Sequence, residues 1–191
     1  MDLFPNKDEI VLSLYDINWI RQTQGDKAEM NIDIYNKEKS WSFISCWTLE
    51  TTDWRRFWEE YGNKSNAVMV KVSVKRLKTE LNKSEITTFM PIVLYFDIIK
   101  HALGIFNSIR MLSRKPLDFK WEQEVRIIVF NFRPKEPLPE SMFIPVNLNN
   151  IIEEIIVSPF ATEEFMEMVR GLLLKKGFST KILSKSRIKL S

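Results

Sequence analysis

Two carboxylates and a guanidinium alternate along one short stretch of the chain, where single residues separate Glu122, Glu124 and Arg126. The β-branched and aromatic residues of the stretch 120–130 predict a strand. Strand side chains alternate between two faces, so these three should point the same way, with neighbours about 7 Å apart. Paired carboxylates can orient a hydroxyl or nucleophile and stabilise the positive charge of an opening ribose. A catalytic interpretation therefore predicts that Glu124→Gln abolishes ligand turnover and leaves the fold intact.

The same three charges also have a purely structural interpretation. Arg126 would neutralise one of the acids in a cross-strand ion-pair ladder on a solvated sheet face. Because burying an unpaired ion is too costly, the trio must be paired, solvated or functional. The spacing alone leaves both interpretations open.

Other candidate residues lie on neighbouring predicted elements. Ser45, on a predicted central strand over residues 42–48, can hold a catalytic carboxylate in place. A predicted helix over residues 53–61 carries aromatic residues at i, i+3, i+4 and i+7. Within this stripe, Trp58 and Tyr61 are candidates for stacking on a base or a nicotinamide, and a hydrophobic core is the alternative.

A group of basic residues precedes the charged strand and offers a second kind of binding chemistry. These residues are candidates for a phosphate site or an RNA-binding surface, and solvated surface charge is the alternative. They are Arg110, Arg114, Lys115 and Lys120.

Composition excludes several classes of site. The chain has 191 residues, of which 45% are hydrophobic, and this fits one folded domain over residues 1–191. With five glycines it contains neither a dinucleotide-binding nor a P-loop motif. One cysteine, Cys46, and one histidine exclude an internal disulfide and a Cys/His zinc site, so no metal is expected, and Cys46 is predicted to be buried packing. The cysteine content and the acidic start predict a cytoplasmic protein, and no apolar run is long enough to span a membrane.

Hydrophobic periodicity predicts an α+β fold with a mixed or mostly antiparallel sheet and about three to four helices. Thr162 is a predicted N-cap and Gly177 a predicted C-cap of the last helix. The predicted strands include residues 10–15, 28–35, 42–48, 67–74, 90–97, 120–130, 142–146, 155–157 and 179–183, and the predicted helices are 53–61, 75–81, 98–113 and 163–176.

Three segments, in order, resemble a known family. They are CWTLETTDWRRFWEEYGNKSNAVMVKV at 46–72, FKWEQEVRIIVF at 119–130 and IEEIIVSPFATEEFMEMVRGLLLKKGF at 152–178. This pattern is similar to the bacterial domain-of-unknown-function family numbered twenty-nine seventy-one, and the resemblance covers residues 41–184. It implies a bacterial origin and an architecture, and it implies no assigned activity.

A more distant similarity concerns ADP-ribosyltransferases. SFIS at 42–45 and EQEV at 122–125 resemble the Ser-x-Ser/Thr strand and the Glu-x-Glu strand of those enzymes. The resemblance implies NAD as the ligand, with Glu124 acting on the nicotinamide ribose, Glu122 positioning the acceptor and Ser45 in support. Cys46 interrupts the serine motif, and the residues offer no NAD-gripping Arg or His.

Two functions follow as hypotheses. The first is a nucleotide- or NAD-handling transferase whose cleft combines Ser45 with Trp58 and Tyr61 and with the Glu122, Glu124 and Arg126 strand. The second is a non-catalytic binding or regulatory module in bacterial defence that recognises a protein or nucleic acid.

Overall fold

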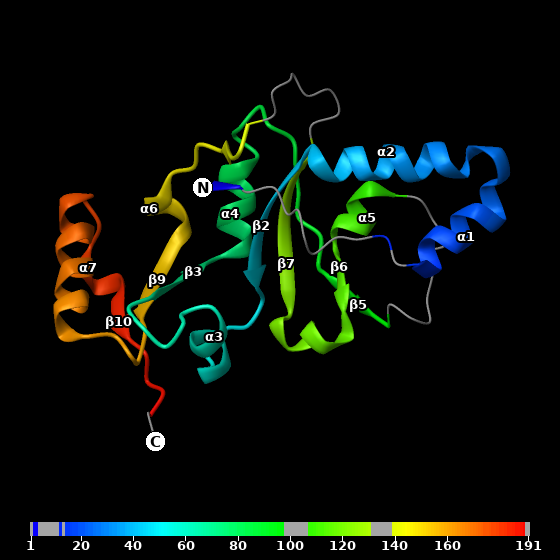
Figure 1. Cartoon of the computed structure of the whole chain (residues 1–191). Coiled ribbons are helices and arrows are strands. Elements are labelled where there is room, and N and C mark those ends of the chain that lie inside the picture. The colour runs from blue at the N-terminus through cyan, green and yellow to red at the C-terminus, as the bar shows by residue number, and fades with distance from the viewer. Residues whose placement is uncertain (1, 4–11, 13, 98–106, 131–138, 190–191) are drawn as a thin grey trace. The chain divides into compact units, whose positions relative to one another are not determined.

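The fold is α+β, with mostly antiparallel sheets (Figure 1). A computed structural model describes residues 2–3, 12, 14–97, 107–130 and 139–189. The chain divides into two compact units, each built from two stretches of sequence. Unit 1 comprises residues 1–50 and 84–145, and unit 2 comprises residues 51–83 and 146–191. The single domain over residues 1–191 stays a prediction.

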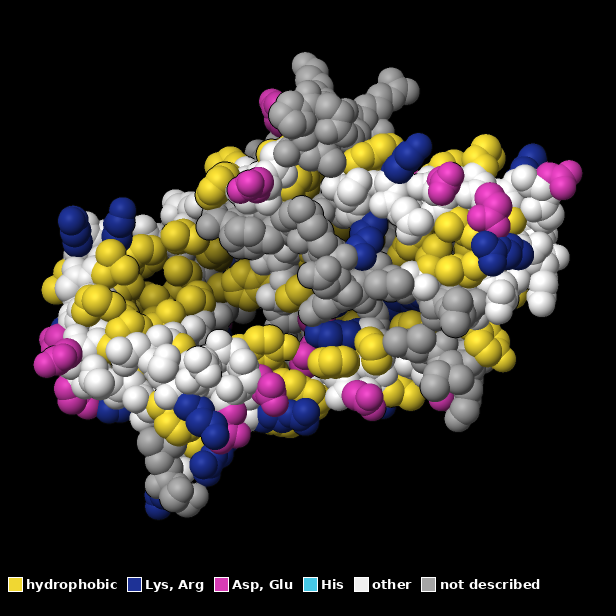
Figure 2. Space-filling view, viewed as in Figure 1, with side chains coloured by type: hydrophobic (Ala, Val, Ile, Leu, Met, Phe, Trp, Pro, Cys, Tyr) yellow, Lys and Arg dark blue, Asp and Glu magenta, His cyan; other side chains and the backbone are white. Residues whose placement is uncertain are grey.

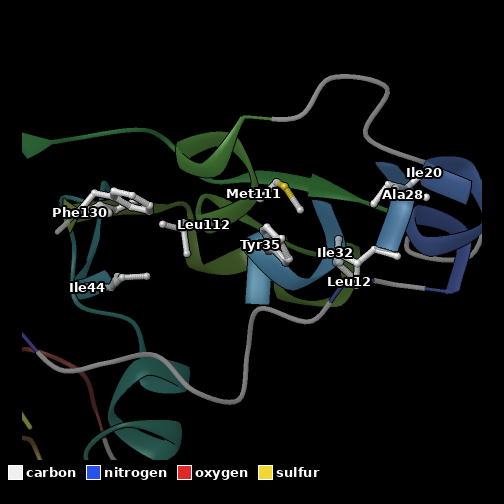
Figure 3. Packing of buried hydrophobic residues seen from close by; sticks show 10 residues of the cluster. Leu12, Ile20, Ala28, Ile32, Tyr35, Ile44, Met111, Leu112 and Phe130 are labelled. Atoms are coloured by element: carbon white, nitrogen blue, oxygen red, sulfur yellow. The ribbon is translucent and has the colours of Figure 1, made fainter. Parts of the chain in front are cut away.

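The helices of unit 1 gather around one hydrophobic core. They are α1 (Leu14–Gln24), α2 (Ala28–Ser40) and the short α5 (Ser108–Leu112). The buried cluster combines these helices with the sheet, and Figure 3 shows Tyr35 pointing in among its aliphatic neighbours. Its members are Leu12, Ile20, Ala28, Ile32, Tyr35, Ile44, Met111, Leu112, Ile128 and Phe130.

The main sheet of unit 1 has the strand order β2-β7-β4, with both pairs antiparallel. Its strands are β2 (Ser42–Thr48), β4 (Thr88–Phe89) and β7 (Glu124–Phe130). Two short pairs accompany it: β5 (Leu94–Phe96) parallel to β6 (Arg114–Pro116), and β1 (Asp2–Leu3) antiparallel to β8 (Met142–Phe143). Every residue of β7 is buried, so it is the central strand of this sheet in burial as well as in order.

Unit 2 is a three-stranded sheet with the order β10-β9-β3 and a helix on one face. Strand β9 (Ile152–Val157) runs antiparallel to β3 (Val68–Val72) and parallel to β10 (Leu183–Lys185). Helix α7 (Glu163–Lys175) packs Val169 and Leu173 against Ile155 of β9. The remaining helices of the unit are α3 (Arg55–Glu60), α4 (Val74–Leu81) and α6 (Leu148–Ile151).

Helix α7 follows its sequence signals closely. The Thr162 hydroxyl accepts a hydrogen bond from the Phe165 amide at 3.2 Å, as expected of an N-cap. Gly177 ends the helix with a φ of +76°, a conformation that glycine adopts without strain. The predicted helices at 53–61 and 75–81 are confirmed as α3 and α4, although Trp54 precedes α3 without a side-chain cap. The last predicted strand begins later, because a short 3-10 helix occupies Thr180–Ile182.

One predicted strand of unit 1, over residues 28–35, is wrong, because these residues belong to helix α2. Residues 28–35 alternate in polarity, but the buried members are Ala28, Ile32 and Tyr35, at helical spacing. Met30 and Ile34, which share the apolar positions of the alternation with Ile32, are exposed. The predicted strand at 10–15 overlaps the start of α1 and otherwise lies mostly outside the described residues.

The described part of the chain therefore contains seven α-helices, compared with the three to four that the sequence predicts. The long helix predicted over 98–113 is represented by α5, and residues 98–106 lie outside the described range. Within the described ranges, no helix combines the length and apolar character that crossing a bilayer requires.

Candidate functional site

The residues that lead into β7 do not continue the strand backwards. Leu117–Glu122 form a 3-10 helix, and Gln123 has a left-handed φ of 44°. The predicted strand start at residue 120 is therefore wrong, and β7 begins at Glu124. The left-handed residue breaks the two-residue alternation between Glu122 and Glu124, so the convergence of their side chains needs another explanation.

Lys115 brings the two carboxylates together. Its Nζ atom lies 2.6 Å from Oε2 of Glu122 and 3.4 Å from Oε2 of Glu124. Arg126 completes the group: its Nε and Nη2 atoms donate to the two oxygens of Glu124 at 2.7 and 3.2 Å. We call Lys115, Glu122, Glu124 and Arg126 the ion-pair cluster; it balances two negative charges with two positive charges.

The ion-pair cluster is buried. Arg126 is 0% exposed, and the other three residues are between 3% and 6% exposed. The Nη1 atom of Arg126 also donates to the carbonyl oxygen of Leu112 at 2.9 Å, which ties β7 to the end of α5. Backbone contacts fix the acids as well, since the Glu124 amide donates to the Tyr95 hydroxyl at 2.8 Å. The solvated ladder of the structural interpretation is therefore replaced by a buried one.

Burial alone would raise the pKa of the Glu124 carboxyl, and it is the largest single influence. The hydrogen bond and the charge of Arg126, with smaller contributions from the Cys46 thiol and from Lys115, outweigh it. The pKa of Glu124 consequently lies below its ordinary value. Glu124 is thus a carboxylate that its neighbours keep ionised.

Ser45 and the acids lie on neighbouring strands but face opposite ways. In the antiparallel register of β2 and β7, Ser45 pairs with Ile127, whereas Thr48 pairs with Glu124. Directly opposed residues share a face, so Ser45 points away from the side chains of Glu124 and Arg126. The predicted adjacency of the two strands is confirmed, and the predicted convergence of Ser45 with the carboxylates is wrong. The Ser45 hydroxyl instead accepts a hydrogen bond from the Trp47 indole at 3.0 Å.

Cys46 occupies the face that Ser45 does not. It pairs with Arg126 across the strands, is exposed, and forms a hydrogen bond with Glu124. The prediction of a buried packing role for Cys46 is therefore wrong, because its strand end reaches the surface of the unit.

The two aromatic candidates, Trp58 and Tyr61, belong to unit 2. Trp58 is buried, and its indole donates to an oxygen of Asp53 at 3.3 Å. Tyr61 is 65% exposed and stacks near Phe57 with ring centroids 6.1 Å apart. Trp58 thus follows the core alternative, and Tyr61 is the accessible one of these two candidates.

Two of the four basic residues before β7 are buried inside unit 1. Arg114 is buried and donates to both oxygens of Asp16, at 3.2 and 2.6 Å, and its guanidinium stacks over the Phe96 ring at 4.5 Å. Lys115 belongs to the ion-pair cluster. The prediction that Arg114 and Lys115 contribute to an RNA-binding surface is therefore wrong. Of the four basic residues, only Arg110 and Lys120 are exposed.

Sequence reasoning missed the role of Lys115. The available signal is a charge count, since two acids beside a single arginine at the start of an apolar strand require a second cation. In the described residues, no group of three or more His, Cys, Asp or Glu side chains is arranged to hold a metal ion.

No protein-family model, curated protein or solved structure matches this chain. The resemblances to the domain-of-unknown-function family and to ADP-ribosyltransferases therefore stay predictions.

Proposed function

We propose that this chain is a non-catalytic binding module that recognises nucleic acid through unit 2. The proposal rests on how charge is divided between the units. Unit 2 contains fifteen Lys and Arg against nine Asp and Glu, a net charge of +6, whereas unit 1 contains thirteen against sixteen, a net charge of −3. The overall charge of +3 conceals this division, and a strongly basic unit is the electrostatic signature of a polyanion partner.

The positive charge of unit 2 is only partly neutralised by its own acids. Six of its acids, among them Glu59 and Glu80, already form ion pairs within the unit. Figure 2 shows Lys and Arg side chains standing out at the end of α7 and near the segment that follows β10. In the described part of unit 2, seven exposed cations have no acid within ion-pair distance: Lys75, Lys78, Lys175, Lys176, Lys181, Arg187 and Lys189.

The ion-pair cluster supports the non-catalytic side of the proposal. A catalytic Glu124 would have to reach a ribose, but its two oxygens accept from Arg126 and from Lys115 in a buried, charge-balanced group. A nucleotide- or NAD-handling transferase remains the rival hypothesis, and NAD cleavage by the purified protein is its direct test.

Affinity for a short nucleic-acid duplex should fall steeply as salt concentration rises. We expect a loss of roughly 10- to 100-fold between about 50 and 200 mM salt, which corresponds to about two to four phosphate contacts. Fluorescence anisotropy across a salt series measures the slope. Changing Lys175 and Lys176 together to Gln should make the slope shallower by about two, because each phosphate contact contributes about one.

The matched control changes Arg110 and Lys120, two exposed cations of unit 1, to Gln, and the slope should stay as in the wild type. Binding that is absent at the lowest salt concentration, or that does not respond to salt, contradicts the proposed function. If the Arg110 and Lys120 variant weakens nucleic-acid binding and the Lys175 and Lys176 variant does not, the assignment of binding to unit 2 is contradicted.

A further inference from the structure

A hollow with a volume of about 530 Å³ lies in unit 2, between α4 and α6. Its size is within the range of small-molecule sites, but its walls are more polar than those of most such sites. Four lining residues come from α4 and two from the short α6 that packs against it. The lining residues are Lys75, Arg76, Thr79, Glu80, Asn149 and Asn150.

The cations of the hollow are available to a ligand. Lys75 is exposed and, in the described part of the chain, has no acidic partner. Arg76 contacts an oxygen of Glu153 only at 3.9 Å, the outer edge of an ion pair, and the two side chains are 58% and 37% exposed. A guanidinium has five N–H donors, and this single long contact leaves most of them available. Arg76 can therefore donate to two oxygens of one phosphate group.

Glu80 is the one acid that lines the hollow, and its carboxylate already has hydrogen-bond and ion-pair partners. One oxygen accepts from Lys83 at 2.5 Å and from the Asn150 side chain at 2.8 Å, and the other accepts from the Asn147 amide at 3.3 Å. These contacts, the Lys83 hydrogen bond foremost, hold the pKa of the Glu80 carboxyl below its ordinary value.

Glu80 is consequently a positioning residue that fixes Asn150 at the wall. With Lys75, Arg76 and Lys83 opposing Glu80 and Glu153, the neighbourhood keeps a net charge of +1.

We propose that the α4–α6 hollow binds a phosphate group, carried either by a free nucleotide or by a nucleic-acid backbone. Lys75 and Arg76 supply the charge, the side-chain amides of Asn149 and Asn150 supply neutral hydrogen-bond donors, and the remaining volume accommodates a sugar. The inference rests on the proposed function only for the backbone source, since the chemistry of the hollow is the same for a nucleotide.

The test is a titration of the ¹⁵N-labelled full chain with inorganic phosphate, with adenosine monophosphate and with adenosine, followed by NMR. The side-chain amide signals of Asn149 and Asn150 should shift with the two phosphate probes and stay in place with adenosine. Arg76→Met and Lys75→Met should each weaken adenosine monophosphate binding by about tenfold or more. Arg55→Met is the matched control, because this exposed arginine of unit 2 pairs with Glu59 and does not line the hollow, and its affinity should match the wild type.

Three results would overturn the phosphate site: no shift at Asn149 and Asn150, equal shifts with adenosine, or equal weakening by Arg55→Met and Arg76→Met. A short oligonucleotide, titrated against the same variants, separates the two sources. Loss of both affinities in Arg76→Met indicates a backbone phosphate, and loss of the mononucleotide alone indicates a free nucleotide. If the protein binds the mononucleotide but no oligonucleotide, the phosphate site stands and the proposed function is refuted. If it binds the oligonucleotide but no mononucleotide, only the phosphate site is refuted.

Discussion

Replacing Arg126 with Met is expected to lower the free energy of unfolding by about 3–5 kcal/mol. The substitution leaves Glu122 and Glu124 buried with a single cation, Lys115, between them. It also removes the hydrogen bond to the Leu112 carbonyl, which links β7 to α5. Methionine retains most of the side-chain volume. The loss of stability therefore comes mainly from the missing charge and hydrogen bonds, and only in small part from a cavity. Urea denaturation followed by circular dichroism measures the difference.

Arg110→Met is the matched control for this experiment. Arg110 is an exposed arginine of the same unit, and its replacement should change the free energy of unfolding by about 0.5 kcal/mol or less. If Arg126→Met is as mild as this control, the ion-pair cluster does not hold unit 1 together.

Asp16→Ala should destabilise the protein by a similar amount, about 3–5 kcal/mol. Asp16 and Arg114 are both buried, 98 residues apart in sequence, and their two hydrogen bonds connect α1 to β6. Alanine leaves the Arg114 guanidinium buried without its carboxylate, and stacking over the Phe96 ring compensates only a small part of that cost. The midpoint and slope of urea unfolding give the change.

Two further variants make this second prediction sharp. Asp33→Ala removes an exposed aspartate from α2 and should alter stability by about 0.5 kcal/mol or less. The double variant Asp16→Leu with Arg114→Met removes both charges together and should recover much of the loss, because hydrophobic replacements of a whole buried pair are often tolerated. If the double variant is less stable than Asp16→Ala, the loss of stability in Asp16→Ala does not arise from leaving Arg114 buried without a partner.

Local chemistry made parts of the fold predictable. The last helix was readable from Thr162 and Gly177, because a capping hydroxyl and a left-handed glycine act within one turn of the chain. Helix α2 was missed because residues 28–35 satisfy a two-residue and a helical period at once, and only the packing of Tyr35 in the core decides between them. Tertiary contacts of this kind cannot be read from the alternation itself.

The candidate site was predictable only in part of its membership and not in its geometry. The sequence identified Glu122, Glu124 and Arg126 as a group, and they do come together. It could not reveal the left-handed Gln123, since no glycine marks the position. Nor could it place Lys115 between the acids, because that contact depends on how β6 and the 3-10 helix fold back on β7.

The division of charge between the units was equally hidden from the sequence. Both units combine segments that are distant along the chain, so a window of sequence mixes residues of the acidic unit with residues of the basic one. The total charge then shows a mildly basic protein where the folded chain separates a basic unit from an acidic one.

The most direct test of this account is Glu124→Gln, studied in stability and in function on the same preparation. Structural use of the carboxylate predicts a free energy of unfolding lower by at least about 2 kcal/mol, because a neutral amide cannot balance Arg126 and Lys115. Nucleic-acid affinity of the folded protein should equal that of the wild type. An unchanged stability together with the loss of an NAD-cleaving activity present in the wild type would contradict the account and establish Glu124 as a catalytic residue.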